Sequence, residues 1–208
     1  IGPIIIFTPW DFISFIASIL IILVVLFIQY VKRISNSKVL NFVGEIISLT
    51  YALPGAVIGI SIILLFAPIN DSLGFLLIGS IPVLVYAYFI RYMAVAVSPI
   101  LTSFKKYPKK LDDAGKSIGL KPFQFFRKIF MPLNKNAIII AFCICFVDIM
   151  KDLPLTLILR PFNFDTLATQ TYEYAIEEMI TKSSIYSLTI IIFGIILLSI
   201  LSIKQSKK

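Results

Sequence analysis

Long apolar runs alternate along this chain with short polar segments. A helix that crosses a bilayer needs about 20 predominantly apolar residues, and residues 12–31 form such a run without a single charge. The pattern continues and predicts five membrane-spanning helices, over residues 12–31, 46–69, 73–97, 137–159 and 183–203. The expected fold class is therefore all-α, a polytopic transmembrane helical bundle, with residues 1–208 forming a single transmembrane domain.

Helix-breaking and charged residues interrupt two of these runs. The second is broken by Pro54 and Gly55, where proline removes a backbone donor and predicts a kink that faces protein and not lipid. The fourth is the weakest, because charges and a proline occupy residues 148–154. Residues 70–72 predict a tight turn before the third span, and Thr8 is expected to cap the first.

Composition agrees with a membrane protein, since the chain is 59% hydrophobic and 14% charged with a mean hydropathy of +0.97. A net charge of +8 would suggest a nucleic-acid partner in a soluble protein, but Lys and Arg are confined to a few connections. Residues 32–38, 105–135 and 204–208 carry three, nine and three of them, against three within 151–182. The positive-inside rule therefore predicts an N-terminus outside and a C-terminus in the cytoplasm. Because the positive charge is explained by membrane orientation, we expect the lipid bilayer as the surroundings and no nucleic-acid partner.

The longest basic connection, residues 105–135, has the pattern of two short helices joined at a glycine. Pro108 can open the first helix, whose positions i, i+3, i+4 and i+7 share one face and are Leu111, Ala114, Gly115 and Ile118. The opposite face is expected to carry the charged residues Asp112, Asp113 and Lys116, the aspartates lying in the first turn, where the helix dipole favours negative charge. Gly119 is the expected C-terminal cap.

A second short helix is expected from Pro122 to Pro132, with Phe123, Phe126 and Phe130 on one face. A basic amphipathic segment of this kind can also lie on anionic lipid with its lysines at the headgroups. The pattern by itself leaves that alternative open.

These residues resemble the cytoplasmic signature of the integral membrane permease subunits of binding-protein-dependent ABC importers, which reads Glu-Ala-Ala, three residues, Gly, nine residues, then Ile-x-Leu-Pro. The chain has Asp113-Ala114-Gly115, then Gly119, then Ile129-Phe130-Met131-Pro132, with both spacings intact. The resemblance implies a type I, MetI-like permease of the bacterial inner membrane with a coupling helix that docks on separate cytoplasmic ABC ATPase subunits. The residues assigned to docking are Leu111, Asp112, Asp113, Ala114, Gly115, Ile118, Gly119 and Pro132. Gly115 is the main departure, since glycine weakens a helix interior by about 1 kcal/mol relative to alanine.

A second resemblance involves residues 146–178, most of them in the segment 151–182 that is expected outside. They are similar to the corresponding region of iron(III) permeases within the same superfamily, as are residues 51–55. Those permeases have two homologous halves, and this chain, with one coupling loop, resembles the C-terminal half alone. The resemblance implies iron(III) as cargo, an external substrate-binding protein and a second permease half or chain. Permeases for thiamine, polyamine or phosphonate share the loop and are the alternatives, and a secondary transporter or channel is the alternative from another class.

Ionisable residues at membrane depth are costly and are typical of transport pathways. The candidates for a translocation path are Tyr51, Pro54, Gly55, Asp148, Lys151 and Asp152. An equally simple interpretation of Asp148 is a structural ion pair with Lys151 or Arg160. Arg91, near the end of the third span, is interpreted as snorkelling to the headgroups.

In the segment expected outside, Asp165 or Thr166 can cap a helix that runs to about Met179. Its acidic residues are Glu173, Glu177 and Glu178. Carboxylate oxygens suit a hard cation such as iron(III), but a solvated face or a docking face for a binding protein explains the same pattern without a metal.

The residue types in the sequence do not indicate a catalytic site. Cys143 and Cys145 lie two apart in an apolar run and predict two small buried side chains, with neither a zinc site nor a disulfide. The sequence has no histidine and no GxSxG or HExxH motif. We therefore expect no catalytic residue, no metal site and no cofactor, and a transport subunit in place of an enzyme, with ATP hydrolysis in a partner.

Overall fold

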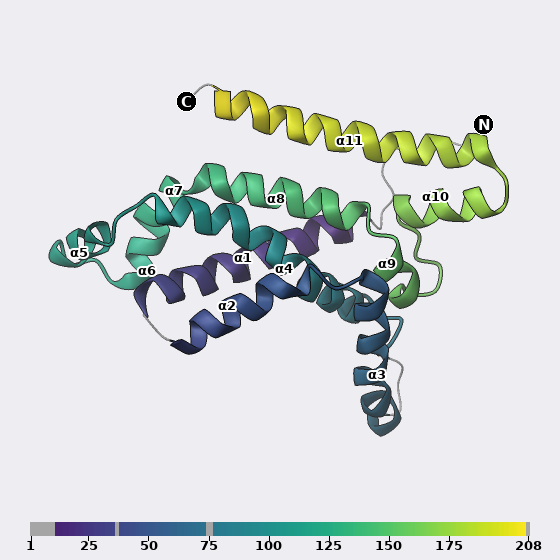
Figure 1. The fold of residues 1–208 in the computed structure, drawn as a ribbon, viewed down its shortest axis with the longest axis horizontal. Coiled ribbons are helices and arrows are strands. Elements are labelled where there is room, and N and C mark those ends of the chain that lie inside the picture. The colour runs from purple at the N-terminus through teal and green to yellow at the C-terminus, as the bar shows by residue number, and fades with distance from the viewer. Residues whose placement is uncertain (1–10, 36–37, 74–76, 207–208) are drawn as a thin grey trace.

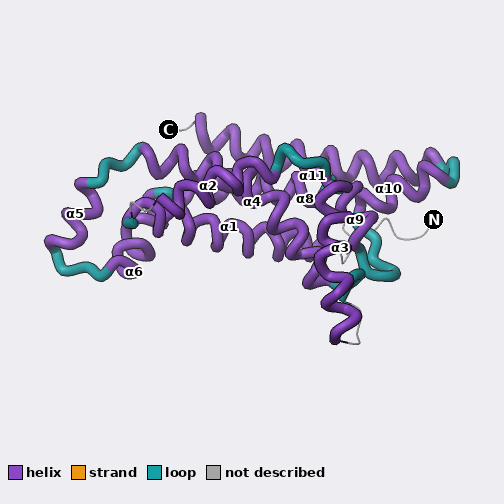
Figure 2. The backbone as a smooth tube through the Cα atoms, turned by 60° about the horizontal axis from the view of Figure 1, so that its bottom comes forward, coloured by secondary structure: helices purple, strands orange, loops and turns teal. Residues whose placement is uncertain are grey.

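The computed structural model describes residues 11–35, 38–73 and 77–206, and within these ranges it contains helices and no strands (Figures 1 and 2). The helices are α1 (Asp11–Ile34), α2 (Lys38–Thr50), α3 (Gly55–Leu73), α4 (Ile81–Lys105), α5 (Lys110–Ser117), α6 (Pro122–Phe125), the π-helix η1 (Phe126–Phe130), α7 (Met131–Leu133), α8 (Lys135–Met150), α9 (Pro154–Leu159), α10 (Leu167–Ile176) and α11 (Ile180–Ser206). The all-α prediction is confirmed.

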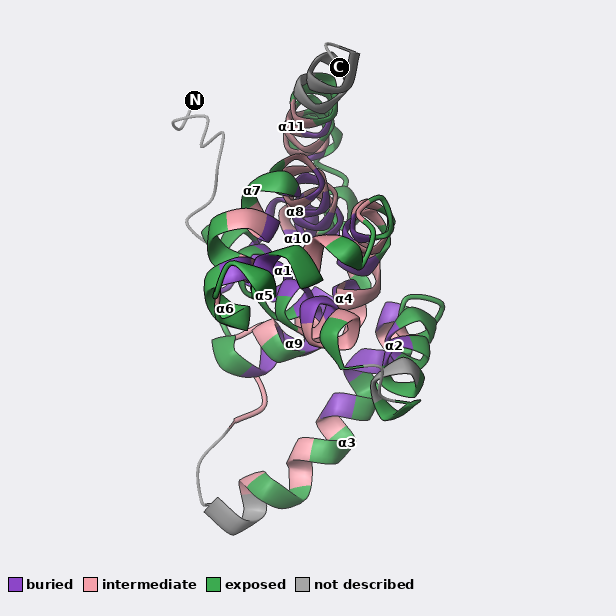
Figure 3. Cartoon of the chain, turned by 90° about the vertical axis from the view of Figure 1, so that its left-hand side faces the viewer, coloured by how far each residue is buried: buried purple, intermediate pink, exposed green. Residues whose placement is uncertain are grey.

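The centre of the bundle consists of α1, α4 and α8, which pack against one another (Figure 1). Small side chains lie fully buried at these contacts, among them Ala17 of α1, Ala87 and Ala96 of α4, and Ala141 of α8. Small residues let helix backbones approach closely, which is how helices associate where lipid removes the hydrophobic driving force. Buried residues accordingly concentrate in the middle of the bundle in Figure 3.

Three helices are long and apolar enough to cross a membrane, namely α1, α4 and α11, the last over Ile180–Ser199. Two bent pairs of helices also qualify if each pair is taken as one span, which gives up to five. The polytopic transmembrane architecture is thus confirmed. The number five is reached only when broken helices are included.

The second predicted span is two helices at a steep angle. Residues 42–50 of α2 and 55–70 of α3 differ in direction by 114°, which is more than a proline kink within one helix. The carbonyl of Pro54 accepts hydrogen bonds from the amides of Val57 and Ile58 at 3.0 and 3.2 Å, so this proline starts a new helix. In Figure 1, α3 projects away from the bundle.

The tight turn predicted at 70–72 is wrong, because α3 continues through these residues. The Asn70 side chain accepts a hydrogen bond from the Leu77 amide at 2.8 Å and so links α3 to the segment before α4. The third span accordingly begins at Ile81. The cap predicted at Thr8 lies outside the described residues.

The fourth span divides into α8 and α9, as the charges and proline of 148–154 indicated. After it, α10 begins at the predicted cap, where the Thr166 hydroxyl accepts the Thr169 amide at 3.3 Å. This helix ends at Ile176 and does not reach Met179, because Glu178 has a φ of 60°. The long α11 then packs on α10 and α8.

Candidate functional site

The connection between α4 and α8 forms a short helix, a glycine turn and a second short helix at one end of the bundle (Figure 1). Its first helix, α5, ends in a Schellman arrangement in which the Leu120 amide donates to the Gly115 carbonyl at 3.1 Å and the Gly119 amide donates to the Lys116 carbonyl at 2.9 Å. Gly119 has a φ of +77°, the left-handed conformation that favours glycine at this position. The predicted C-terminal cap is confirmed.

The aromatic face of the second helix differs from the prediction. Phe125 and Phe130 are buried, whereas Phe123 is 70% exposed. The reason is the π-helix that follows α6, because i to i+5 spacing brings residues five apart to one face. Phe126 is partly buried against the same core.

Gly115 carries the closest packing in this region. A Cβ built on it would lie 2.3 Å from the ring of Phe125, so no other residue fits without a shift of that ring. Gly115 is buried in an otherwise exposed stretch of α5. The sequence suggested only a weakened helix at this position, but the structure shows a glycine that lets α6 pack directly on α5.

Arg33, at the end of α1, holds α5 in place and was not identified from the sequence. Its Nη2 lies 2.7 Å from Asp112 Oδ2, and its Nε donates to the same oxygen at 2.9 Å. Nη1 donates to the Phe104 carbonyl at 2.8 Å and Nη2 to the Pro108 carbonyl at 3.0 Å. Asp112 therefore faces α1 on the inner side of α5, where Gly115 also lies, and not on the side opposite Gly115 as predicted.

The outer side of α5 stays open. Of the predicted face, only Gly115 is buried and Leu111 half-buried, while Ala114 is exposed and Ile118 is 71% exposed. Asp113 is exposed beside them and pairs with Lys116 at 3.6 Å, a solvated contact of little energy. Pro132, in α7, is exposed as well. The end of the bundle thus presents a small apolar and acidic surface made of Asp113, Ala114 and Ile118.

A buried polar network occupies the middle of the bundle, where α4 faces the break between α8 and α9. The carboxylate of Asp152 accepts the amides of Leu155 and Thr156 at 3.0 and 3.4 Å and so caps α9. Its second oxygen accepts the hydroxyl of Tyr92, and Thr156 shares a 2.7 Å hydrogen bond with Tyr88. Asp152 therefore connects α9 to α4 through hydrogen bonds.

Arg91 belongs to this network and does not snorkel. Its Nε lies 3.3 Å from Asp152 Oδ2, and its guanidinium lies 5.6 Å from the centroid of the Tyr92 ring. A Cβ on Gly55 would lie 2.0 Å from Nη1, so the start of α3 closes over the guanidinium. Nε and Nη1 are buried without a hydrogen-bond partner among the described residues.

The remaining path candidates gather around Asp148. This buried carboxylate pairs with Lys151 at 2.6 Å, as one interpretation of the sequence expected. Asp148 and Tyr51 both line an open cavity of about 680 Å³ between α2, α4 and α8. The candidates thus fall into one group at this cavity and another, Gly55 and Asp152, around Arg91, while Pro54 is exposed at the start of α3.

Arg160 is not a partner of Asp148. It binds Asp165 at 2.6 Å and also pairs with Glu173, which joins the end of α9 to α10. Among the described residues no group of three or more Cys, Asp or Glu side chains is placed to hold a metal ion. Cys143 and Cys145 are buried and form no disulfide.

Together, the long apolar helices and the broken spans are typical of an integral membrane protein. A family model, the binding-protein-dependent transport system inner membrane component, matches residues 30–205. The chain belongs to this family. The prediction of an inner-membrane permease is thereby confirmed.

Known relatives agree with this assignment. The chain is similar to the Fe(3+)-transport system permease protein FbpB 2 of Haemophilus influenzae, with 26% identity over 146 residues that cover 70% of this chain and 28% of that protein. The chain therefore spans less than a third of that relative's length.

Two solved structures share the fold. One shows inward-facing conformations of the MetNI methionine ABC transporter, with a TM-score of 0.64 and 18% identity, covering 95% of this chain and 88% of that one. The other is a bacterial ABC transporter for the import of alginate, with a TM-score of 0.64 and 12% identity, covering 98% of this chain and 80% of that one. At these identities the comparison shows the fold alone.

Proposed function

We propose that this chain is the membrane-embedded permease part of an ATP-driven importer, and that the segment 105–135 couples it to a separate ATPase subunit. The observation that carries the proposal is the construction of α5. Its inner side is fixed to the bundle by Gly115 and Asp112, and its outer side presents Asp113, Ala114 and Ile118 to a partner. A rigid short helix with an exposed apolar residue is suited to insertion in a groove.

The orientation follows from charge. Segment 105–135 carries nine Lys and Arg residues, and it lies at the opposite end of the bundle from the connection between α10 and α11 (Figure 1). Excess positive charge favours the cytoplasmic side. The segment 105–135 and the C-terminus are accordingly assigned to the cytoplasm and 151–182 to the outside, where a substrate-binding protein delivers the cargo.

The cargo is assigned as iron(III), which rests on the similarity to a permease named for Fe(3+) transport. The path is assigned to the cavity beside Asp148 and Tyr51 and to the neighbouring break between α2 and α3. Broken helices at membrane depth are tolerated where protein or a water-filled cavity surrounds them. A second permease half or chain supplies the opposite wall.

The test is capture of an ATPase subunit by the tagged full-length permease from membranes. Ile118→Asp places a charge on the proposed docking surface and is expected to abolish capture and uptake of radioactive iron(III). Phe162→Asp changes a residue that is 96% exposed between α9 and α10, and it is expected to preserve capture. Equal capture by both variants would contradict docking on α5. Capture with uptake of a different cargo would retain the importer and exclude iron.

A further inference from the structure

The guanidinium of Arg33 joins the end of α1 to three acceptors between residues 104 and 112, which lie 71 to 79 residues away in the sequence. It binds the carboxylate of Asp112 in α5, the carbonyl of Phe104 near the end of α4 and the carbonyl of Pro108 in the turn between them. The Arg33 side chain is only 9% exposed, and its guanidinium lies 4.9 Å from the centroid of the Phe130 ring. Every nitrogen of the fork is engaged, which holds its position more firmly than a single ion pair would.

Asp112 depends on this arginine. Both contacts from Arg33 reach Oδ2, while Oδ1 is buried without a hydrogen-bond partner among the described residues. Arg33 therefore supplies both side-chain contacts of this carboxylate that the described part of the chain shows. Because the Asp112 side chain is only 15% exposed, loss of its counter-ion destabilises the carboxylate at this position.

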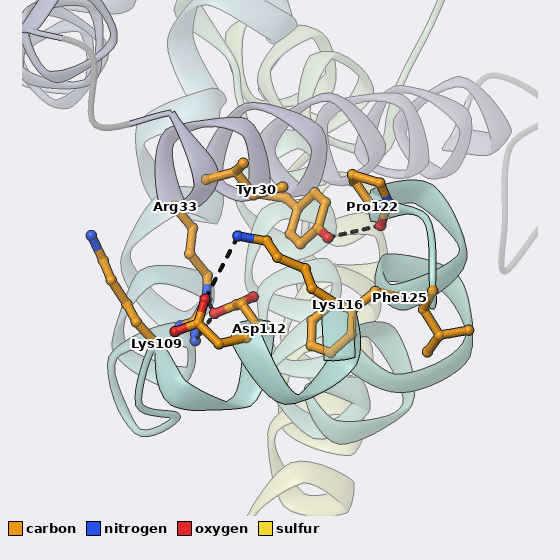
Figure 4. A pocket seen from close by; sticks show the side chains of 10 residues that line it. Tyr30, Arg33, Lys109, Asp112, Lys116, Pro122 and Phe125 are labelled. Atoms are coloured by element: carbon orange, nitrogen blue, oxygen red, sulfur yellow. Dashed lines mark hydrogen bonds and ion pairs between the residues drawn. The ribbon is translucent and has the colours of Figure 1, made fainter. Parts of the chain in front are cut away.

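Side-chain hydrogen bonds and an ion pair, more than close packing, connect α1 to α5. A cavity of about 150 Å³ lies between them, lined by residues that include Tyr30, Arg33, Lys116 and Phe125 (Figure 4). One turn before Arg33, the Tyr30 hydroxyl donates to the Pro122 carbonyl at 2.8 Å. Among the described residues, α1 thus holds one end of α5 through Arg33 and the start of α6 through Tyr30.

We propose that Arg33 is a positioning residue that transmits displacement of α5 to α1 and α4. The proposal rests on the proposed docking of an ATPase subunit on α5. When that subunit moves α5, the Arg33 contacts move the end of α1 and the end of α4 together, because the guanidinium belongs to α1 and binds both Asp112 of α5 and Phe104 of α4. Without Arg33 the partner still docks on Asp113, Ala114 and Ile118, but part of its movement is absorbed at the cavity. The rest reaches α1 through Tyr30 and reaches α4 through the connecting backbone.

The test uses the full-length permease with its ATPase subunits in proteoliposomes and measures ATP hydrolysed per iron(III) ion imported. Arg33→Gln and Asp112→Asn are each expected to raise this ratio about tenfold, the size expected when a buried charge-assisted hydrogen bond is lost. Arg33→Lys keeps the charge without the fork and is expected to fall between them and wild type. The matched control is Lys32→Gln, which removes the same charge from the neighbouring position and is expected to leave the ratio unchanged.

The double variant with both Arg33→Gln and Asp112→Asn separates transmission from simple instability. If the two residues act as one link, its ratio equals that of the single variants, while capture of the ATPase subunit stays at the wild-type level. An unchanged ratio in Asp112→Asn would overturn the proposal, as would parallel loss of capture and uptake in both single variants. Failure of the wild-type permease to capture an ATPase subunit would instead overturn the proposed function itself, and the role of Arg33 with it.

Discussion

Two partly buried arginines, Arg33 and Arg91, differ in how completely their side chains are hydrogen-bonded. Arg33 lies at the end of α1 and uses Nε, Nη1 and Nη2 in hydrogen bonds to a carboxylate and two carbonyls. Arg91 lies within α4, where its Nε and Nη1 have no hydrogen-bond partner among the described residues and its nearest carboxylate, Asp152, is also engaged by Tyr92. All three guanidinium nitrogens of Arg33 are hydrogen-bonded. Arg91 is held instead by its ion pair with Asp152 and by packing against Gly55.

This difference matches the two roles that the proposed coupling to an ATPase would require. A link that transmits movement has to keep its geometry, and a fully hydrogen-bonded guanidinium does so. A group beside a path has to accept more than one arrangement, and donors that lack partners make a rearrangement inexpensive. Arg33 therefore suits the proposed coupling segment 105–135, and Arg91 suits the region where α3 and α9 meet α4.

The largest expected effect is at Asp152, the partner of Arg91. Asp152→Ala removes the cap of α9 and leaves Arg91 without a counter-ion, and breaking such a pair costs about 3–5 kcal/mol. Unfolding of the purified permease in detergent measures this loss. The control is Asp165→Ala, which breaks a half-exposed pair with Arg160 and is expected to cost less than about 1 kcal/mol. Equal losses would show that the Asp152 contacts stabilise the fold no more than the pair of Asp165 with Arg160.

The next effect tests the packing of α5 against α6. Gly115→Ala places a methyl group against the Phe125 ring, and overpacking of this kind costs about 1–3 kcal/mol. Both thermal stability and ATPase capture are expected to fall. Adding Phe125→Leu relieves the contact and is expected to restore part of both. If the double variant is worse than Gly115→Ala by the full cost of Phe125→Leu, the close contact is not the cause.

An effect of similar size tests the comparison of the two arginines directly. Arg33→Lys loses the fork that reaches three acceptors, and hydrogen bonds to charged groups contribute about 1.5–3 kcal/mol. Arg91→Lys keeps the charge near Asp152 and loses donors that made no hydrogen bond, so it is expected to be the milder change. The midpoints of unfolding of the two variants give the comparison. The reverse order would show that Arg91 is the more firmly held of the two.

The smallest effect is at the glycine cap of α5. Nothing lies within 4 Å of a Cβ on Gly119, so Gly119→Ala meets only backbone strain, about 1 kcal/mol for a left-handed residue. Gly119→Asn is the control, because asparagine tolerates this conformation better. Helix content and ATPase capture are expected to fall slightly in the alanine variant and less in the asparagine variant.

Local chemistry predicted much of the fold. The apolar runs predicted the helical class, and Asp165 or Thr166 predicted the start of α10. Pro108 and the apolar periodicity after it predicted the helix α5, and Gly119 predicted its cap. Each of these signals acts within a few residues of its effect. They are therefore readable without knowledge of neighbouring elements.

Errors and omissions arose where the conformation or the contacts of a residue cannot be read from its near neighbours in the sequence. The phenylalanine face was wrong because η1 changes the helical period, and residues 70–72 extend α3 although their sequence favours a turn. Arg33 and Asp112 are 79 residues apart, and no local pattern marks either as the partner of the other. Arg91 was misplaced for the same reason, since its surroundings come from α3 and from the break before α9.

The most direct test of the central claim is site-specific photo-crosslinking in membranes from position 118 of the full-length permease. A crosslinking residue at Ile118 is expected to form an adduct with the ATPase subunit, and the same residue at Phe162, at the other end of the bundle, is expected to form none with that subunit. Adducts with lipid alone from position 118 would contradict the account and would leave α5 as a basic helix at the membrane surface.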